Sequence, residues 1–271
     1  MIRIISILVG LFFSAALLWS FGNGAYTAIT EPAPATVEHE FHKHPKEVAF
    51  ASDGAFGKFD NQQLQRGFQV YMEVCASCHA LKHVAFRDLK AIGYNDDEVK
   101  AIAAKAQIPV YNSNTGEVAS HPGLPTDYFP PVVYGGQGSP PDLSLITKAR
   151  HEGPAYVYSL LTGYAAQPAE LVKEFPDAKT PDGLFYNPYF PNLNLAMMPP
   201  LTADDQVTYA DGTKATVDQM SKDVSAFLIW TAEPKLDKRK QTGWAVLGFL
   251  LFATVLAYMA YRNIWAEKKG H

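Results

Sequence analysis

The segment VCASCHA, residues 74 to 80, contains both cysteines of this 271-residue chain. Cys75 and Cys78 are three positions apart, and His79 follows directly. Because no other cysteine exists to pair with either one, a disulfide framework that joins distant parts of the fold is excluded. The pair therefore serves a chemical purpose. Three chemistries use C-x-x-C: a redox dithiol, half of a zinc site, and covalent haem attachment.

Haem attachment explains all three residues of the motif. In C-x-x-C-H the two thiols bond to the haem vinyl groups as thioethers, and the adjacent histidine becomes an axial iron ligand. A zinc site needs four ligands, and the histidines within residues 39 to 44 lie in a polar stretch. A thioredoxin-like dithiol needs a strand-to-helix junction, but the residues before Cys75 have a helical pattern. We predict one haem c, attached to Cys75 and Cys78, with His79 on the iron.

The second axial ligand must come from another part of the chain. Methionine is the usual second ligand in electron-transfer cytochromes c, because its soft thioether favours ferrous iron. Met197 and Met198 lie in LNLAMMPPL, where two prolines stiffen the loop and prevent a helix. Of the other methionines, Met1 is the initiator and Met259 lies in the C-terminal apolar segment. Met72 and Met220 lie on expected helices, where packing explains them. The alternative ligands are His83, His121 and His151.

The N-terminal segment has the pattern of an export signal, which a haem c protein requires. Arg3 precedes the apolar run Ile4 to Trp19, whose 16 residues would span about 24 Å as a helix. The hydrocarbon core of a membrane is roughly 30 Å thick. We therefore expect residues 1–24 to be a cleaved signal peptide, with retention as a membrane helix as the alternative. Residues 25–54 form an N-terminal extension without an assigned role.

A second apolar run, Thr242 to Tyr261, has 20 residues without a charge. Trp244 and Tyr258 lie near its two ends, as membrane-interface anchors do. We predict a transmembrane anchor over residues 242–261, after a linker at 235–241 and before a cytoplasmic tail at 262–271. A buried core helix is the alternative.

The charge is unevenly distributed along the chain. Residues 29–234 carry 15 Lys and Arg against 25 Asp and Glu, which gives −10, whereas the whole chain has a formal charge of −4. An acidic exported domain attracts a basic, diffusible partner over a long range, and it does not suit nucleic acid. Ordinary solubility is the alternative explanation.

Residues 55–234 have the pattern of a mainly α, cytochrome c-type haem domain with long irregular insertions. Asp60 is the expected N-cap of a helix that leads to Cys75, and Gly67 would let a second helix approach closely. That partner is expected within residues 216–234, ended by Pro234. A short helix is expected within 153–164, and a weak β pattern with a turn lies within 206–217. The expected apolar faces are Leu64, Phe68, Tyr71 or Met72, and Cys75 on the first helix, and Met220, Val224, Phe227, Leu228 and Thr231 on the second.

Four sequence blocks resemble one known family. They are GFQVYMEVCASCH, PPDLSLITKARHEGPAYVYSLLTGY, YNPYFPNLNLAMMPPL and DGTKATVDQMSKDVSAFLIWTAEPKLDKRKQTG, which occur in this order before the C-terminal anchor. They are similar to the cytochrome c1 family, the haem c subunits of the cytochrome bc1 complex, in its bacterial form. The resemblance covers most of the chain after residue 55.

The resemblance implies roles for particular residues. It favours Met197 over Met198 as the iron ligand. It places Arg150 at a haem propionate and Pro141 near His79.

The resemblance also implies a function. The haem would accept single electrons from the Rieske iron–sulfur protein and pass them to a cytochrome c. Cytochrome b would be the partner on which quinol is oxidised, so this chain would carry out no bond-making catalysis. The haem domain would lie on the periplasmic side of a bacterial inner membrane, with the C-terminus in the cytoplasm. The alternatives are a membrane-anchored cytochrome c that serves an oxidase directly, and a peroxidase, which needs an open iron position.

Overall fold

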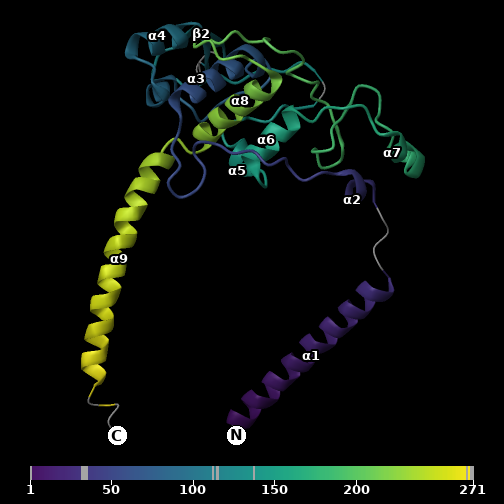
Figure 1. Ribbon diagram of the computed structural model, residues 1–271, viewed down its shortest axis with the longest axis vertical. Helices are drawn as coiled ribbons and strands as arrows, with labels where there is room; N and C mark the ends of the chain where they lie inside the picture. Colours follow the sequence, from purple (N-terminus) through teal and green to yellow (C-terminus); the bar gives the residue numbers. More distant parts are fainter. Residues whose placement is uncertain are drawn as a thin grey trace. The chain divides into compact units, whose positions relative to one another are not determined.

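The computed structural model describes residues 2–31, 36–111, 113, 116–136, 138–266 and 268, and helices predominate (Figure 1). This confirms the predicted mainly α class. The chain divides into two compact units, Met1–His42 and Lys43–His271. The first contains α1 (Ile2–Thr30) and α2 (Val37–Phe41). The second contains α3 (Asn61–Val70), a π-helical turn (Tyr71–Cys75), a 3-10 helix (Phe86–Ile92), α4 (Asp96–Ala104), β1 (Gln107–Tyr111), β2 (Val118–Pro122), α5 (Ile146–Ala149), α6 (Gly153–Leu161), α7 (Ala169–Glu174), a 3-10 turn (Pro176–Ala178), β3 (Phe185–Tyr186), β4 (Asn194–Leu195), α8 (Val217–Ala232) and α9 (Leu236–Trp265).

Helices α3 and α8 pack directly against each other, as Figure 1 shows. Asp60 is the N-cap of α3, and its carboxylate accepts hydrogen bonds from the backbone N–H groups of Gln62 and Gln63. At Gly67 an added Cβ would lie 2.0 Å from the carbonyl oxygen of Asp223 on α8. Only glycine allows the two backbones to come this close, which confirms the predicted crossing point.

The apolar face of α8 forms the centre of the core. Thr216 caps the helix by accepting a hydrogen bond from the N–H of Gln219, and α8 ends two residues before Pro234. All five residues predicted for this face are buried: Met220, Val224, Phe227, Leu228 and Thr231. On α3 and the turn after it, Tyr71 is buried, whereas Met72 is 39% exposed. The structure therefore selects Tyr71 from the two expected alternatives.

Aromatic rings fill the space between α3 and α8. The ring of Phe227 lies 5.5 Å from that of Phe68 and 5.9 Å from that of Tyr71, between centroids. Phe129 continues the cluster toward the 3-10 helix, 4.4 Å from the ring of Phe86. Burial of these large rings provides much of the hydrophobic stabilisation of this unit.

A buried ion pair also links the two helices. Asp223 on α8 has no exposed surface, and its carboxylate accepts a hydrogen bond of 2.8 Å from Nε of Arg66 on α3. Gln63 and Gln219 donate to the same carboxylate. Arg66 also binds Asp211, in the loop before α8. A buried charge pair is stable only with such additional hydrogen bonds, and helical patterning does not predict them.

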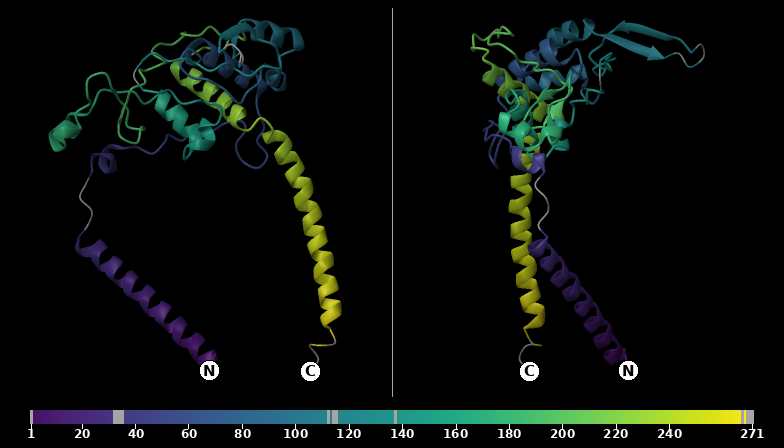
Figure 2. Two further views of the ribbon diagram at one scale, coloured as in Figure 1. Left: turned by 180° about the vertical axis from the view of Figure 1, so that it is seen from behind. Right: turned by 90° about the vertical axis from the view of Figure 1, so that its right-hand side faces the viewer.

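Two small hairpins lie outside the helical core. Strands β1 and β2 pair antiparallel, from Gln107 opposite Pro122 to Tyr111 opposite Val118, and project from the domain in the right-hand view of Figure 2. Strands β3 and β4 form a second short pair. The β pattern predicted within residues 206–217 is wrong, because no strand forms among these residues, all of which the structure describes. The predicted turn is present, with Gly212 at a φ of 77°.

The N-terminal extension contributes to the second unit, which begins at Lys43, before the boundary expected at residue 55. The backbone N–H of Lys46 donates to Ser159 on α6, and its ammonium group donates to the hydroxyl and carbonyl of Thr162. Burial lowers the pKa of Lys46. These contacts give part of residues 25–54 a structural role that the sequence alone does not indicate.

The two longest helices are apolar. Helix α1 has 29 residues and α9 has 30, and both are long and apolar enough to cross a membrane. Helix α9 confirms the predicted C-terminal apolar helix. It begins at Leu236, so it includes most of the residues assigned to a linker. Cleavage of residues 1–24 as a signal peptide, at a point that lies within α1, stays a prediction.

Candidate haem-binding site

The C-x-x-C-H motif follows a distorted end of α3. A hydrogen bond of 2.8 Å from the N–H of Ala76 to the carbonyl of Tyr71 closes a π-helical turn, a feature that is common at functional sites. The N–H groups of Cys78 and His79 both donate to the carbonyl of Cys75, at 3.1 and 2.9 Å. The motif is therefore a compact turn, and both cysteines are free and half-buried. Burial and the neighbouring Cys78 raise the pKa of the Cys75 thiol to about 12.

The imidazole of His79 has a defined orientation. Its Nδ1 lies 2.7 Å from the backbone carbonyl oxygen of Pro141. Because a carbonyl oxygen only accepts hydrogen bonds, Nδ1 is the donor in this contact, and in the neutral ring Nε2 then has the lone pair that a metal needs. The hydroxyl of Tyr71 donates to the carbonyl of His79 at 2.8 Å and so restrains the backbone of His79.

The structure brings together Pro141 and His79, two of the residues predicted for the site. The chain after Pro141 runs alongside the chain after His79 and is hydrogen-bonded to it. Three hydrogen bonds join these segments: Leu143 N–H to the Ala80 carbonyl, Lys82 N–H to the Asp142 carboxylate, and His83 N–H to the Ser144 hydroxyl. The carbonyl that orients His79 is therefore part of a well-connected segment.

Met197 and Met198 have different environments. Met197 is half-buried, whereas Met198 is 64% exposed. The carbonyl of Met197 accepts a hydrogen bond of 2.9 Å from the hydroxyl of Tyr164. Burial raises the pKa of Tyr164 well above its usual value, so this hydroxyl keeps its proton and remains a donor.

Arg150 lies directly after α5 and is exposed, and its guanidinium donates to the carbonyl of Ala149. It interacts with Tyr156, whose pKa is raised by burial and lowered in part by the Arg150 charge. Tyr156 in turn influences the pKa of Tyr164. The two tyrosines were not predicted as site residues, because a tyrosine between apolar positions of a helix has the pattern of a core residue.

The histidines that remained as alternative ligands lie in different settings. His121 is in β2, where its Nδ1 contacts the carbonyl of Pro122 and lies 4.0 Å from the Asp127 carboxylate. His83 and His151 are exposed. Among the described residues, no three His, Cys, Asp or Glu side chains converge to hold a metal ion. Within the residues that the structure describes, no cluster of ligands supports the alternative of a zinc site.

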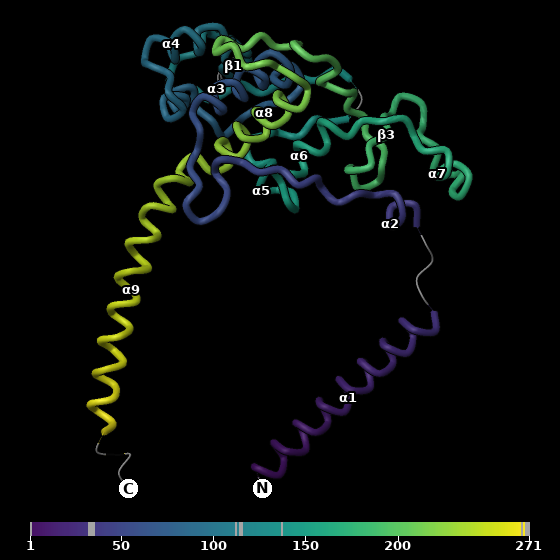
Figure 3. The backbone as a smooth tube through the Cα atoms, viewed as in Figure 1, coloured from purple at the N-terminus to yellow at the C-terminus, as the bar shows by residue number. Residues whose placement is uncertain are grey.

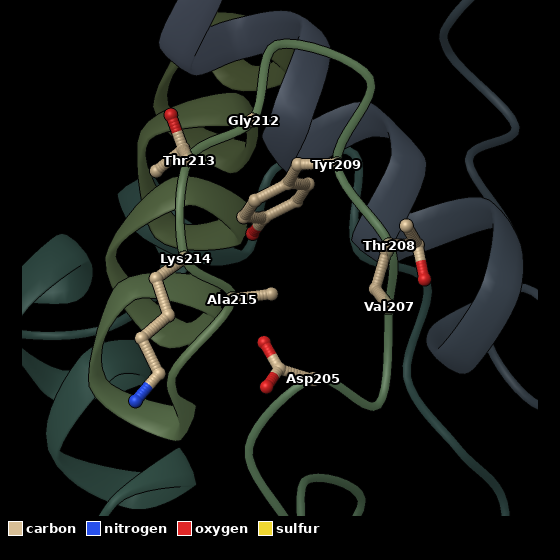
Figure 4. A pocket seen from close by; sticks show the side chains of 8 residues that line it. All are labelled: Asp205, Val207, Thr208, Tyr209, Gly212, Thr213, Lys214 and Ala215. Atoms are coloured by element: carbon tan, nitrogen blue, oxygen red, sulfur yellow. The ribbon is translucent and has the colours of Figure 1, made fainter.

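An open hollow of about 340 Å³ lies beside the loop before α8 (Figure 4). Its lining residues are Asp205, Val207, Thr208, Tyr209, Gly212, Thr213, Lys214 and Ala215. None of them is a predicted haem-binding residue. The ring of Tyr209 lies 5.8 Å below the Arg66 guanidinium, so the hollow borders the ion network between α3 and α8.

The donor set agrees with a covalently attached haem. Two free thiols precede a histidine whose Nε2 is available, and a half-buried thioether lies in a separate, proline-stiffened loop. A helical domain with this motif and an apolar C-terminal helix has the features of a membrane-anchored c-type cytochrome.

Comparisons with known proteins give the family. Residues 50–268 match the model of the cytochrome C1 family. Cytochrome c1 of Rhodospirillum rubrum is 43% identical over 238 residues, which cover 80% of this chain and 85% of the relative. The cytochrome b-c1 complex catalytic subunit of Candida albicans mitochondria is 39% identical over 251 residues, 90% of this chain and 84% of the relative. The mitochondrial cytochrome c1, heme protein, of Saccharomyces cerevisiae is 39% identical over 249 residues, 89% of this chain and 76% of the relative.

The chain belongs to the cytochrome c1 family. Members of this family are haem-containing electron-transfer subunits of the cytochrome bc1 complex, and helix α9 agrees with a membrane location.

Proposed function

We propose that this chain carries one haem c and transfers single electrons from a Rieske iron–sulfur protein to a cytochrome c within a cytochrome bc1 complex. The observation that carries the proposal is the orientation of His79 by the Pro141 carbonyl, directly after two free thiols. In the proposal, Cys75 and Cys78 would hold the haem through two thioethers, and His79 and Met197 would bind its iron. When bound, haem supplies an iron centre that gains or loses one electron.

His79 would hold the iron in one position throughout the reaction. The hydrogen bond to Pro141 fixes the tautomer and the ring plane. The backbone bonds around Ala80 and Leu143 keep the two segments together. A ligand that moves little between oxidation states favours rapid electron transfer.

The Met197 loop would supply a thioether, which favours ferrous iron and raises the reduction potential. Tyr164 holds the backbone of this loop, and the two prolines after Met198 limit its motion. The Arg150 guanidinium would balance the negative charge of a haem propionate. Residues with these tasks position the haem and tune it, and none of them needs to form or break a bond.

The proposed partners are cytochrome b and the Rieske protein, with a cytochrome c as acceptor. The support is the relative from Candida albicans, whose name places it in a cytochrome b-c1 complex. The net charge of −10 on residues 29–234 would attract a basic acceptor. We place the haem domain on the periplasmic side of a bacterial inner membrane, with α9 as anchor and the C-terminus in the cytoplasm.

Haem staining after denaturing electrophoresis tests the attachment. We expect the double variant Cys75→Ser, Cys78→Ser to lose the stain, because both thioethers disappear. Ser77→Ala, a change at the exposed position between them, is the control and should keep it. Stain on the double variant would contradict covalent attachment through these cysteines.

Purification from membranes in mild detergent tests the electron path. We expect the haem-stained chain to purify with cytochrome b and the Rieske protein, and a quinol to reduce its haem. After extraction of the Rieske protein, reduction by quinol should stop, and adding that protein back should restore it. Reduction that continues without the Rieske protein, or purification with an oxidase alone, would reject the proposed donor.

A further inference from the structure

The loop Phe50–Phe59 contacts the first turns of α9. The backbone N–H of Phe59 donates to the carboxylate of Asp237 at 3.2 Å. The ammonium group of Lys240 donates to the carbonyls of Ser52 and Gly57, at 2.6 and 3.2 Å. Figure 3 shows the trace of this loop beside the start of α9. The loop therefore joins the anchor helix to the chain that enters α3.

The loop has a defined shape. The carboxylate of Asp53 accepts a hydrogen bond of 2.7 Å from the N–H of Phe50, and the N–H of Lys58 donates to the carbonyl of Ala51. At Gly57 an added Cβ would lie 1.9 Å from the Asp53 carbonyl, so the turn requires glycine. The position of the residues at its tip is thus determined by the loop itself.

Phe56 at the tip is 80% exposed, although it is a large apolar residue. Its ring stacks on that of Trp244 in α9, with centroids 5.0 Å apart and planes 5° from parallel. The indole N–H of Trp244 points to the Ala55 carbonyl at 3.4 Å. The two rings form one apolar surface, which continues into the exposed apolar side chains of α9.

The depth of this surface follows from the position of Trp244. It is the third residue of the uncharged run Thr242 to Tyr261, which spans about 30 Å as a helix, the thickness of a hydrocarbon core. Tryptophan favours the boundary between that core and the headgroups. A residue stacked on Trp244 lies at the same level.

We propose that the loop Phe50–Phe59 is a second membrane contact of the chain, with Phe56 inserted into the lipid interface beside Trp244. The proposal rests on the membrane anchoring of α9 in the proposed function. We assign lipid, and not a protein, as the partner of Phe56, because the exposed face of Phe56 continues the lipid-facing surface of α9. Lys58 and Lys238, both exposed, would lie near the lipid phosphates. Two contacts instead of one would set the height and tilt of the haem domain above the membrane.

Spin labels on the haem-loaded full chain in nanodiscs test this contact. The variant Phe56→Cys receives the label, and collisions with oxygen, which concentrates in lipid, are compared with collisions with a water-soluble nickel chelate. Three matched variants provide the scale. Val133→Cys labels a residue that is 96% exposed and far along the chain from α9, Val246→Cys labels α9 near the start of its uncharged run, and Leu251→Cys labels the middle of that run.

We expect the oxygen-to-nickel ratio at position 56 to be close to that at 246 and well above that at 133. A ratio equal to that at 133 would overturn the proposal. A ratio that rises only when cytochrome b is added would also overturn it, because a protein partner and not lipid would then cover Phe56.

The same experiment separates this proposal from the proposed function. Frequent collisions of the nickel chelate with the label at position 251 would show that α9 does not span the bilayer. The membrane contact of Phe56 and the membrane anchoring in the proposed function would then both be rejected. If the spin label reacts with the chain that has no added cysteine, Cys75 and Cys78 are free thiols, which would contradict the proposed thioethers. Comparison of position 56 with positions 133, 246 and 251 would still test the membrane contact of Phe56.

Discussion

Met197 and Met198 are adjacent in sequence, yet Met197 is half-buried whereas Met198 is exposed. We expect Met197→Leu to keep the haem attached while its sixth iron position opens or changes ligand. The reduction potential should fall, because the thioether that favours ferrous iron is lost. The measurements are the weak long-wavelength absorbance of sulfur bound to ferric haem and carbon monoxide binding to the reduced protein.

Met198→Leu is the matched control. It should keep the absorbance band and cost less than about 1.5 kcal/mol in unfolding free energy, because the change conserves volume. Loss of the band in this variant and its persistence in Met197→Leu would reverse the assignment. Persistence in both would return attention to His83, His121 and His151.

Tyr164 offers a second change at the scale of one residue. Tyr164→Phe removes the hydroxyl that donates to the Met197 carbonyl, at a cost of about 1 kcal/mol for one hydrogen bond. We expect the Met197 loop to open more often, so carbon monoxide should bind the reduced protein faster than in the unchanged chain. Tyr128→Phe, at a half-exposed tyrosine, is the control. Equal binding rates in all three proteins would show that Tyr164 does not restrain the ligand loop.

Helices α3 and α8 show what sequence patterns can predict at the level of elements. The N-cap at Asp60, the close approach at Gly67 and the buried face of α8 each depend on local rules, and the structure confirms them. The β pattern within 206–217 failed because the alternation was weak, and because Asp211 is held by Arg66 instead of a strand partner.

Long-range contacts mark the limit of prediction from sequence. Helical periodicity continues through Tyr71–Cys75 and does not reveal a π turn. The bond from His79 to Pro141 joins residues 62 positions apart, and that from Tyr164 to Met197 joins residues 33 apart. The first pair was expected only from the family resemblance, and no pattern indicated the second. The sequence reveals the C-x-x-C-H motif, but only the folded backbone shows which carbonyl group binds His79.

Gly67→Ala tests the helix crossing. The new methyl group would lie 2.0 Å from the Asp223 carbonyl and 2.7 Å from Cβ of Phe227, so the helices must separate. We expect a loss of about 1 to 3 kcal/mol or more in unfolding free energy, as overpacking produces. Thermal unfolding followed by circular dichroism in detergent measures it. The control is Gly248→Ala in α9, where an added Cβ meets no atom within 4 Å. Equal melting temperatures would contradict the close packing.

At the scale of the molecule, the anchor can be separated from the haem domain by truncation. Deleting residues 242–271 should release a soluble haem domain, because α9 loses its apolar run. The measurement is the distribution of haem stain between supernatant and membranes after a high-salt wash. If the truncated chain stays with the membranes, the apolar helix α1 is retained after export and holds it there.

The pairing of α3 with α8 also has a consequence for the time course of folding. The ends of these helices, Val70 and Val217, are separated by roughly 150 residues, and closing so long a loop is entropically costly and slow. In the proposed export, which would begin at the N-terminus, the motif at residues 75 to 79 would emerge well before α8 is available to pack over Gly67. The chain would therefore pass through a period in which Cys75 and Cys78 are accessible for the proposed haem attachment, and packing of α8 against α3 would end that period.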